Sequence, residues 1–181
     1  MRLRTWKSVL PVAIMAAAAA APAVAQERAA SESRSALAGW TFSAAPYTLH
    51  FSDARKENDF EPDNQKHSYV WLFAAEKQLG GRDFAGFAWF NNSFGQPTKY
   101  LYYGWRFEPL ASVPKLFLKL SAGVIHGYKE PYHKKIPFNS RNGWGVTAIP
   151  AVGWQFSPEA AVQVNILGTA GLMLQFNYTF K

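Results

Sequence analysis

The final stretch of the chain alternates large apolar residues with other residue types, and this alternation constrains the fold more than any other feature of the sequence. Between positions 171 and 180, every second side chain is large and apolar: Leu172, Leu174, Phe176, Tyr178 and Phe180. The residues between them are Met173, Gln175, Asn177 and Thr179. A period of two predicts a β-strand with two different faces. Because one face is wholly apolar, it must be covered by protein or by lipid.

Seven further stretches have a strand-like pattern, at residues 40–51, 69–78, 84–90, 99–107, 115–126, 146–156 and 161–167. Aromatic residues make up 16% of the chain and charged residues 17%, yet no segment beyond the N-terminus is an unbroken apolar run of helix length. Such a sequence is typical of a transmembrane barrel, in which only alternate residues face lipid. We therefore predict an all-β fold, an eight-stranded antiparallel transmembrane β-barrel. A secreted soluble β-sandwich is the rival.

The connections between the predicted strands sort by length, which favours the barrel. Short turns around Gly80, Glu108 and Ser157 alternate with long polar connections that begin near Asp53 and Gly127. An even strand number places both chain ends on the periplasmic side, with the longer loops outside. A soluble sandwich has no reason to sort its loops in this way.

The N-terminus predicts export. Residues 1–25 combine a basic start, an apolar run too short to span a bilayer and the small-residue site Ala23-Val24-Ala25, as expected of a signal peptide. Residues 26–39 are predicted to form a short periplasmic arm or helix, and residues 40–181 the barrel.

Charge and cysteine content exclude several function classes. Signal removal takes three of the 19 basic residues and none of the 12 acidic ones, which lowers the net charge from +7 to +4. This mild excess does not indicate a nucleic-acid partner. There is no cysteine, so neither a disulfide framework nor a thiolate site is expected.

All four histidines of the chain fall near the predicted outer end of the barrel: His50, His67, His126 and His133. Histidine is suited to proton transfer near neutral pH, so the clustering favours acid–base chemistry at this end. The alternative is that each is a solvated interfacial residue. No two have the i, i+2 spacing within a strand that a metal site would use, so we predict no metal.

The strand at residues 99–107 predicts a cavity inside the barrel. Its alternation directs Leu101 and Tyr103 outward and Tyr102 and Gly104 inward. An inward glycine would open space in an interior otherwise filled by side chains. Polar residues would form the floor of the resulting pocket: Arg106, Lys119, Gln155 and Gln163. A simple bend at Gly104 is the alternative.

A family resemblance lies in the order and spacing of three sets of residues: 86–97 with 100–105, 126–132 with 135–140, and 167–173. Together they resemble the PagP family of outer-membrane enzymes, which transfer palmitate from phospholipid to lipid A, and most closely its divergent Pseudomonas-type branch. The resemblance implies a monomeric outer-membrane protein with a phospholipid donor, a lipid A acceptor and no cofactor.

The resemblance also implies catalytic residues. His50 takes the place of the family's catalytic histidine and Ser93 that of its serine, while Asn92 stands where enteric members have an aspartate. Because asparagine cannot stabilise a protonated histidine as a carboxylate does, either oxyanion stabilisation or another residue must compensate. His67 and His126 are the alternative bases.

The acyl-chain pocket and the lipid entry route follow from the same resemblance. Gly104 corresponds to the glycine that gauges acyl length in the family, and Tyr102 shares its inward face. Pro46 and Pro150 lie where the family parts its strands to admit lipids sideways. The expected function is palmitoyl transfer from a phospholipid to lipid A, with a lipid A deacylase or a small structural or adhesive barrel as alternatives.

Overall fold

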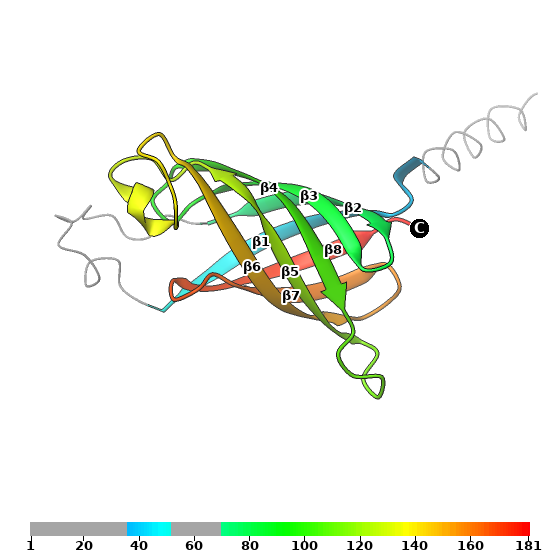
Figure 1. Cartoon of the computed structure of the whole chain (residues 1–181). Helices are drawn as coiled ribbons and strands as arrows, with labels where there is room; N and C mark the ends of the chain where they lie inside the picture. The colour runs from blue at the N-terminus through cyan, green and yellow to red at the C-terminus, as the bar shows by residue number, and fades with distance from the viewer. Residues whose placement is uncertain (1–35, 52–69) are drawn as a thin grey trace, which may run out of the picture. The chain divides into compact units, whose positions relative to one another are not determined.

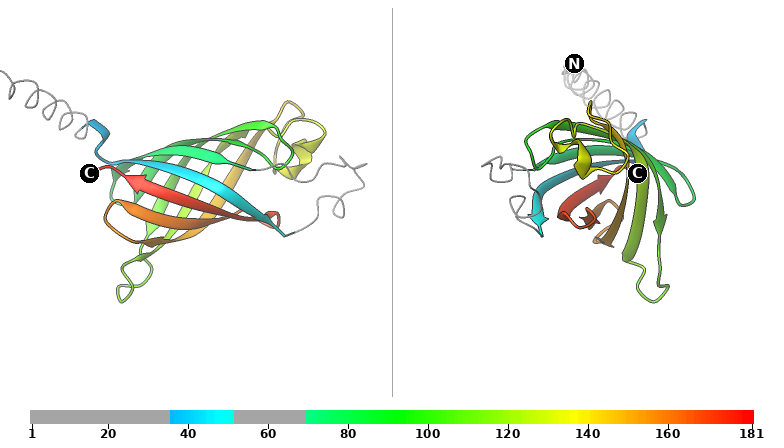
Figure 2. Two further views of the ribbon diagram at one scale, coloured as in Figure 1. Left: turned by 180° about the vertical axis from the view of Figure 1, so that it is seen from behind. Right: turned by 60° about the vertical axis from the view of Figure 1, so that its left-hand side comes forward.

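The protein folds as a closed eight-stranded antiparallel β-barrel (Figures 1 and 2). The computed structural model describes residues 36–51 and 70–181. The strands are β1 (Trp40–His50), β2 (Leu72–Gly80), β3 (Asp83–Asn91), β4 (Pro97–Phe107), β5 (Leu116–His126), β6 (Trp144–Gln155), β7 (Ala160–Ile166) and β8 (Gly171–Thr179), with a short 3-10 helix, η1 (Tyr132–Lys135), between β5 and β6. Each strand pairs with its neighbours in sequence, and β8 pairs with β1. The predicted all-β fold, an eight-stranded antiparallel barrel, is confirmed. The proposed signal peptide, most of the predicted arm and His67 lie outside the described residues.

Alternation sorts the side chains between the two faces of the barrel wall. In β4, Tyr100 and Tyr102 point inward and are 3% and 7% exposed, whereas Leu101 and Tyr103 point outward and are 65% and 41% exposed. In β8, Met173 is buried and its outward neighbours are not. The predicted orientation of these residues is confirmed.

The outer surface is strongly apolar. Outward side chains that are more than about a third exposed come from every strand except β7, and include Phe42, Phe73, Phe87, Trp89, Leu101, Trp105, Leu118, Val124, Trp144, Trp154, Phe176 and Tyr178. A soluble monomer seldom exposes an apolar surface of this extent. The outer surface is therefore compatible with an outer-membrane protein. In the part of the chain that is described, no helix is long and apolar enough to cross a membrane.

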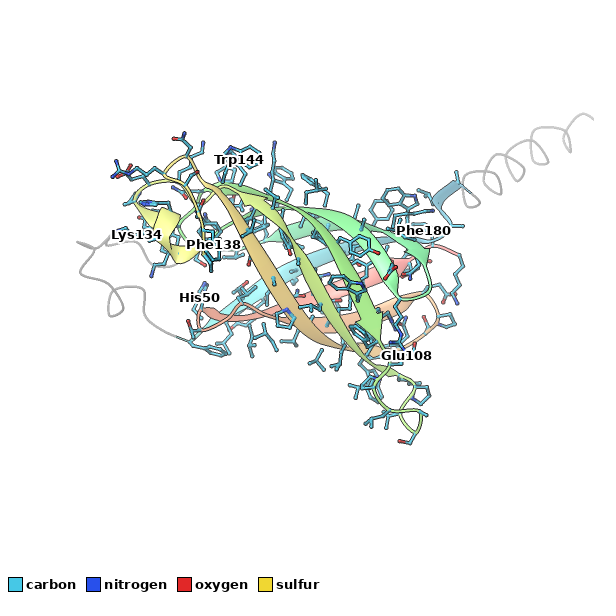
Figure 3. The ribbon with its side chains drawn as sticks, viewed as in Figure 1. His50, Glu108, Lys134, Phe138, Trp144 and Phe180 are labelled. Carbon is cyan, nitrogen blue, oxygen red and sulfur yellow. The ribbon has the colours of Figure 1, made fainter. Side chains whose placement is uncertain are left out.

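The two ends of the barrel differ. At one end, which we call the loop end, β1, β3, β5 and β7 finish, and the connection at residues 127–143 carries η1. The other end has the tight β2–β3 turn and the short β6–β7 connection (Figure 1). Figure 3 shows His50, Lys134 and Phe138 at the loop end, and Glu108 and Phe180 at the other. The predicted sorting of loops is present in part: the connection at residues 127–143 is long and the β2–β3 and β6–β7 connections are short, but the connection at residues 108–115 is longer than the β3–β4 and β7–β8 loops at the loop end. The predicted long connection that begins near Asp53 lies outside the described residues.

Hydrogen bonding between neighbouring strands is incomplete at two places near the loop end. Among the described residues, the β1–β2 pairing stops at Ala45 and Leu72, and the register between β1 and β8 shifts between Ala44 and Tyr47, around Pro46. Likewise β6 pairs with β5 as far as Trp144 but with β7 only as far as Ala151. Pro150, which has no N–H to donate, directly adjoins that last pair.

Candidate active site at the loop end

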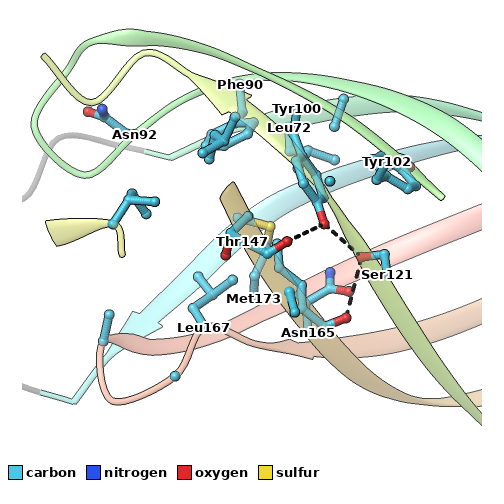
Figure 4. Close-up of a pocket in the computed structure, with 18 of the residues that line it drawn as sticks. Leu72, Phe90, Asn92, Tyr100, Tyr102, Ser121, Thr147, Asn165, Leu167 and Met173 are labelled. Atoms are coloured by element: carbon cyan, nitrogen blue, oxygen red, sulfur yellow. Dashed lines mark hydrogen bonds between the residues drawn. The ribbon is translucent and has the colours of Figure 1, made fainter. Parts of the chain in front are cut away.

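A cavity of about 1050 Å³ occupies the barrel interior and reaches the loop end. It is at the upper end of the size range of ligand pockets in proteins. One apolar wall comes from β2, β3 and Val70, which lies two residues before β2; its other side chains are Leu72, Ala74, Ala88 and Phe90. Figure 4 shows Leu72 and Phe90 on one side of this cavity, with Leu167 and Met173 on another. A long apolar chain could lie within such walls.

His50 and Ser93 meet at the mouth of the cavity. Nε2 of His50 lies 2.6 Å from Oγ of Ser93, although 43 positions separate the two residues in sequence. His50 ends β1, Ser93 belongs to the loop after β3, and both line the cavity. A hydroxyl hydrogen-bonded to an imidazole is the arrangement that activates a serine or orients a basic histidine. The structure therefore brings together two residues predicted from sequence to share a site.

A sequence scan against family models matches none, and no curated protein is similar to the chain in sequence.

Asn92, the third predicted catalytic residue, is 1% exposed and holds the β3–β4 loop in shape. Its Oδ1 accepts hydrogen bonds from the backbone N–H groups of Phe94 and Gln96, both at 3.0 Å. Its Nδ2 donates to Oε1 of Gln96 at 3.3 Å. Gly95 completes the turn at φ +76°, in the left-handed region that glycine tolerates. These contacts make Asn92 a residue that positions its neighbour Ser93.

The connection at residues 127–143 packs against the Ser93 loop. The ring of Phe94 stacks on Tyr132, with centroids 4.0 Å apart and planes 7° apart, and meets Tyr128 edge-on. The backbone N–H of Lys129 donates to Oε1 of Gln96 at 3.1 Å. Burial raises the pKa of Tyr128 to about 12, so this phenol stays neutral and is not a base at physiological pH. The two loops thus support each other beside the His50–Ser93 pair.

Phe138 also lines the mouth of the cavity, although it is 91% exposed. Its φ of +53° is unusual for a residue other than glycine, so the loop holds an aromatic ring at an unfavourable backbone conformation. Sequence reasoning did not single out this residue.

Neither of the other described histidines lines the cavity that His50 and Ser93 share. The ring of His126 packs on Trp144, with centroids 4.4 Å apart, and His126 is not among the residues that line the cavity. His133 lies in η1, and its Nδ1 is buried without a hydrogen-bond partner among the described residues. Within the described ranges, no group of three His, Cys, Asp or Glu residues could hold a metal ion.

The deep end of the cavity is built by aromatic rings that lie over cross-strand glycines. Phe84 pairs with Gly104, and Gly86 pairs with Tyr102. A Cβ on Gly104 would lie 2.4 Å from Cζ of Phe84, and one on Gly86 would lie 2.6 Å from Cζ of Tyr102. The ring of Phe84 therefore fills the space that Gly104 leaves. Phe84 and Tyr102 line the cavity but Gly104 does not, which corrects the expectation that Gly104 opens it.

A buried polar cluster lies beside these rings. Tyr102 donates to Oε1 of Glu76 at 3.1 Å, and Lys119 forms an ion pair with Oε2 of the same carboxylate. The ammonium of Lys119 lies 4.2 Å from the ring centroid of Phe84. The cluster joins β2, β4 and β5 across the interior.

The predicted polar floor needs partial correction. Lys119 and Gln163 line the cavity as expected, but Arg106 and Gln155 do not. Arg106 donates to Oε1 of Gln155 at 3.0 Å, and its guanidinium lies 3.9 Å from the ring centroid of Phe117. Sequence reasoning missed Phe84 and Glu76. Phe84 could have been found, because the short β3–β4 loop sets a register that pairs it with Gly104.

Proposed function

We propose that the protein is an outer-membrane acyltransferase, which moves a palmitoyl chain from a phospholipid to lipid A. The observation that carries the proposal is the 2.6 Å contact between His50 and Ser93 at the mouth of a large cavity that has an extensive apolar wall. The contact supports base-assisted attack on an ester carbonyl, and the cavity supports a long acyl chain as the group that is moved.

His50 is the general base in this proposal. It accepts the proton of the attacking hydroxyl while that oxygen bonds to the ester carbonyl carbon of the phospholipid. The tetrahedral intermediate then collapses, the bond to the glycerol oxygen breaks, and His50 returns the proton to that oxygen. The products are a lysophospholipid and an acylated hydroxyl, so no further reactant is required.

Two routes use the same contact. The hydroxyl of Ser93 can attack first and pass the acyl chain on, or Ser93 can orient His50 while the lipid A hydroxyl attacks directly. Mass spectrometry of the protein after exposure to donor phospholipid alone separates them, because only the first route leaves an acyl group on Ser93.

The unpaired stretches of the wall support lateral entry of lipids. Pro46 and Pro150 lie where β1 parts from β2 and β6 parts from β7, both near the loop end. In this proposal the donor and acceptor reach the His50–Ser93 pair through these stretches from the surrounding membrane.

Mass spectrometry of lipid A from cells with and without the protein tests the proposal. We expect an added palmitoyl chain with the wild-type protein and with His126→Ala, and none with His50→Ala or Ser93→Ala. All of these residues bury little apolar area, so the variants should fold. Loss of an acyl chain would indicate a deacylase, and unchanged lipid A a structural or adhesive barrel. Full activity of His50→Ala would exclude His50 as the base.

A further inference from the structure

Four carboxamide side chains form a closed hydrogen-bonded ring on the inner faces of β7 and β8. Gln163 donates to Asn165 (2.7 Å), Asn165 to Gln175 (2.8 Å), Gln175 to Asn177 (2.7 Å), and Asn177 back to Gln163 (3.0 Å). We call these residues the amide ring. Three of them line the cavity, namely Gln163, Asn165 and Gln175, while Asn177 does not.

The amide ring leaves hydrogen-bonding capacity unused. Each carboxamide carries two N–H donors, and the ring employs one of them. Among the described residues, the second N–H of Gln163, Asn165 and Gln175 has no acceptor. A wholly saturated chain packed against this wall would leave those donors without partners, which costs free energy.

Thr48 adds a second polar group to the same region. Its Oγ1 is buried and lacks a hydrogen-bond partner among the described residues, and Thr48 lines the cavity. Met173 of β8 pairs with Thr48 of β1 on one side and with Asn165 of β7 on the other. A hydroxyl and a carboxamide thus flank the position above Met173.

The wall across the interior is apolar, with Val70, Leu72 and Phe90. Near Thr48 and Asn165 the cavity is therefore amphipathic across its width, while Glu76, Lys119 and Ser121 add polar groups elsewhere in its lining. We propose that it takes an acyl chain that bears a hydroxyl group, which accepts from Asn165 and exchanges a hydrogen bond with Thr48 while the rest of the chain contacts the apolar wall.

The strand register indicates where on the acyl chain this hydroxyl lies. His50 pairs with Gly171, and Met173 and Gln175 are two and four residues further along β8. At the rise of a β-strand, these positions are about 7 Å and about 13 Å from the His50–Ser93 pair. A hydroxyl next to the carbonyl group would lie too close to His50, so the hydroxyl belongs several carbons down the chain.

Equilibrium binding tests this without relying on catalysis. The mature protein in bilayer nanodiscs is titrated with stearate, with a stearate hydroxylated beside the carboxyl group, and with a stearate hydroxylated in mid-chain. We expect the mid-chain hydroxyl to lower Kd about tenfold relative to stearate, and the other to have little effect.

Thr48→Val and Asn165→Leu should each reduce this preference while binding stearate at least as tightly as the wild type. Asn177→Leu is the matched control, because it breaks the amide ring without removing a group from the cavity wall, and it should keep the preference. Circular dichroism confirms that each variant folds. Equal binding of all three ligands by the wild type, or a preference unchanged in both Thr48→Val and Asn165→Leu, would overturn the inference.

The inference rests on the proposed function in assuming that the bound chain is later transferred, and it replaces palmitate by a hydroxylated chain as the preferred acyl group. Palmitoyl transfer without any binding preference would overturn the inference and leave the proposed function standing. A binding preference with unchanged lipid A would support the inference and overturn the proposed function, and would indicate a lipid-binding barrel.

Discussion

At the scale of single residues, the position of Ser93 depends on the side chain before it. Oδ1 of Asn92 accepts two backbone hydrogen bonds inside a five-residue turn, a task that a carboxylate could perform equally well. The loop therefore does not require a carboxylate at this position. Asn92 does not supply a negative charge to His50.

Replacement of Asn92 tests whether the loop and the activity depend on these hydrogen bonds. Asn92→Ala leaves two backbone N–H groups without an acceptor, and each such loss costs about 1–3 kcal/mol when the group is buried. We expect Asn92→Ala to lower both the free energy of unfolding and acyl transfer, and Asn92→Asp to retain the loop and the activity. Denaturant titration and a transfer assay measure the two effects. Wild-type behaviour of Asn92→Ala would show that the turn does not depend on this side chain.

The length of the acyl chain that the cavity accepts should depend on Phe84. Gly104 should affect this length only by changing the position of the Phe84 ring. A methyl group on Gly104 would meet the Phe84 ring and the Leu120 carbonyl oxygen, at 2.4 and 2.6 Å. We expect Gly104→Ala to destabilise the barrel by about 1–3 kcal/mol and to push the ring into the cavity, which favours shorter chains. Phe84→Leu should favour longer chains. The product distribution from donors of graded chain length measures this, and a profile unchanged in Phe84→Leu would contradict it.

At the scale of elements, β2 and β5 are joined across the barrel interior although they are not neighbours in the sheet. The link is the ion pair between Glu76 and Lys119, to which Tyr102 of β4 contributes a hydrogen bond. A buried charge without its partner is far more costly than the absence of the pair, because the remaining ion has lost its hydration.

Single and double replacements of this pair should therefore lower the free energy of unfolding by different amounts. Lys119→Met leaves the Glu76 carboxylate without its cation and should lower the free energy of unfolding by about 3–5 kcal/mol. Glu76→Leu combined with Lys119→Met should recover most of that loss. Unfolding in denaturant, followed by tryptophan fluorescence, compares the variants. A double variant as unstable as Lys119→Met would show that packing, and not charge, is responsible.

At the scale of the whole molecule, the fold turns a large apolar surface outward and keeps its polar clusters inside, the reverse of a soluble protein. Amide, hydroxyl and charged groups fill much of the interior: Ser43, Glu76, Lys119, Gln163, Asn165 and Gln175. This distribution is typical of barrels surrounded by lipid.

The full-length chain expressed in a Gram-negative bacterium should therefore fractionate with the outer membrane and remain dispersed only in detergent. Its circular dichroism spectrum in detergent should be rich in β-structure. The same chain without residues 1–25 provides a control, since it should not reach that membrane. A monomer that is soluble without detergent would contradict the membrane assignment and the lateral entry of lipids proposed for the gaps beside Pro46 and Pro150.

Local features of the sequence were sufficient to predict the strands and their faces. The alternation in β4 and β8 depends only on the two-residue repeat of an extended chain, so it predicts Tyr102 inside and Leu101 outside without knowledge of any contact. The lengths of the connections indicated which strand ends lie together, and hence that His50 and Ser93 occupy one end of the barrel.

The sequence by itself thus determined what repeats along each strand, but only the tertiary structure decided what meets across the interior. The 2.6 Å contact of His50 with Ser93, the ring of Phe84 over Gly104, the pairing of Glu76 with Lys119 and the amide ring all join residues whose separation depends on strand register and barrel closure. A shift of one residue in a single strand pair would turn each inward side chain of that strand outward. Closure of all eight strands removes this freedom, and for that reason the site exists only in the folded barrel.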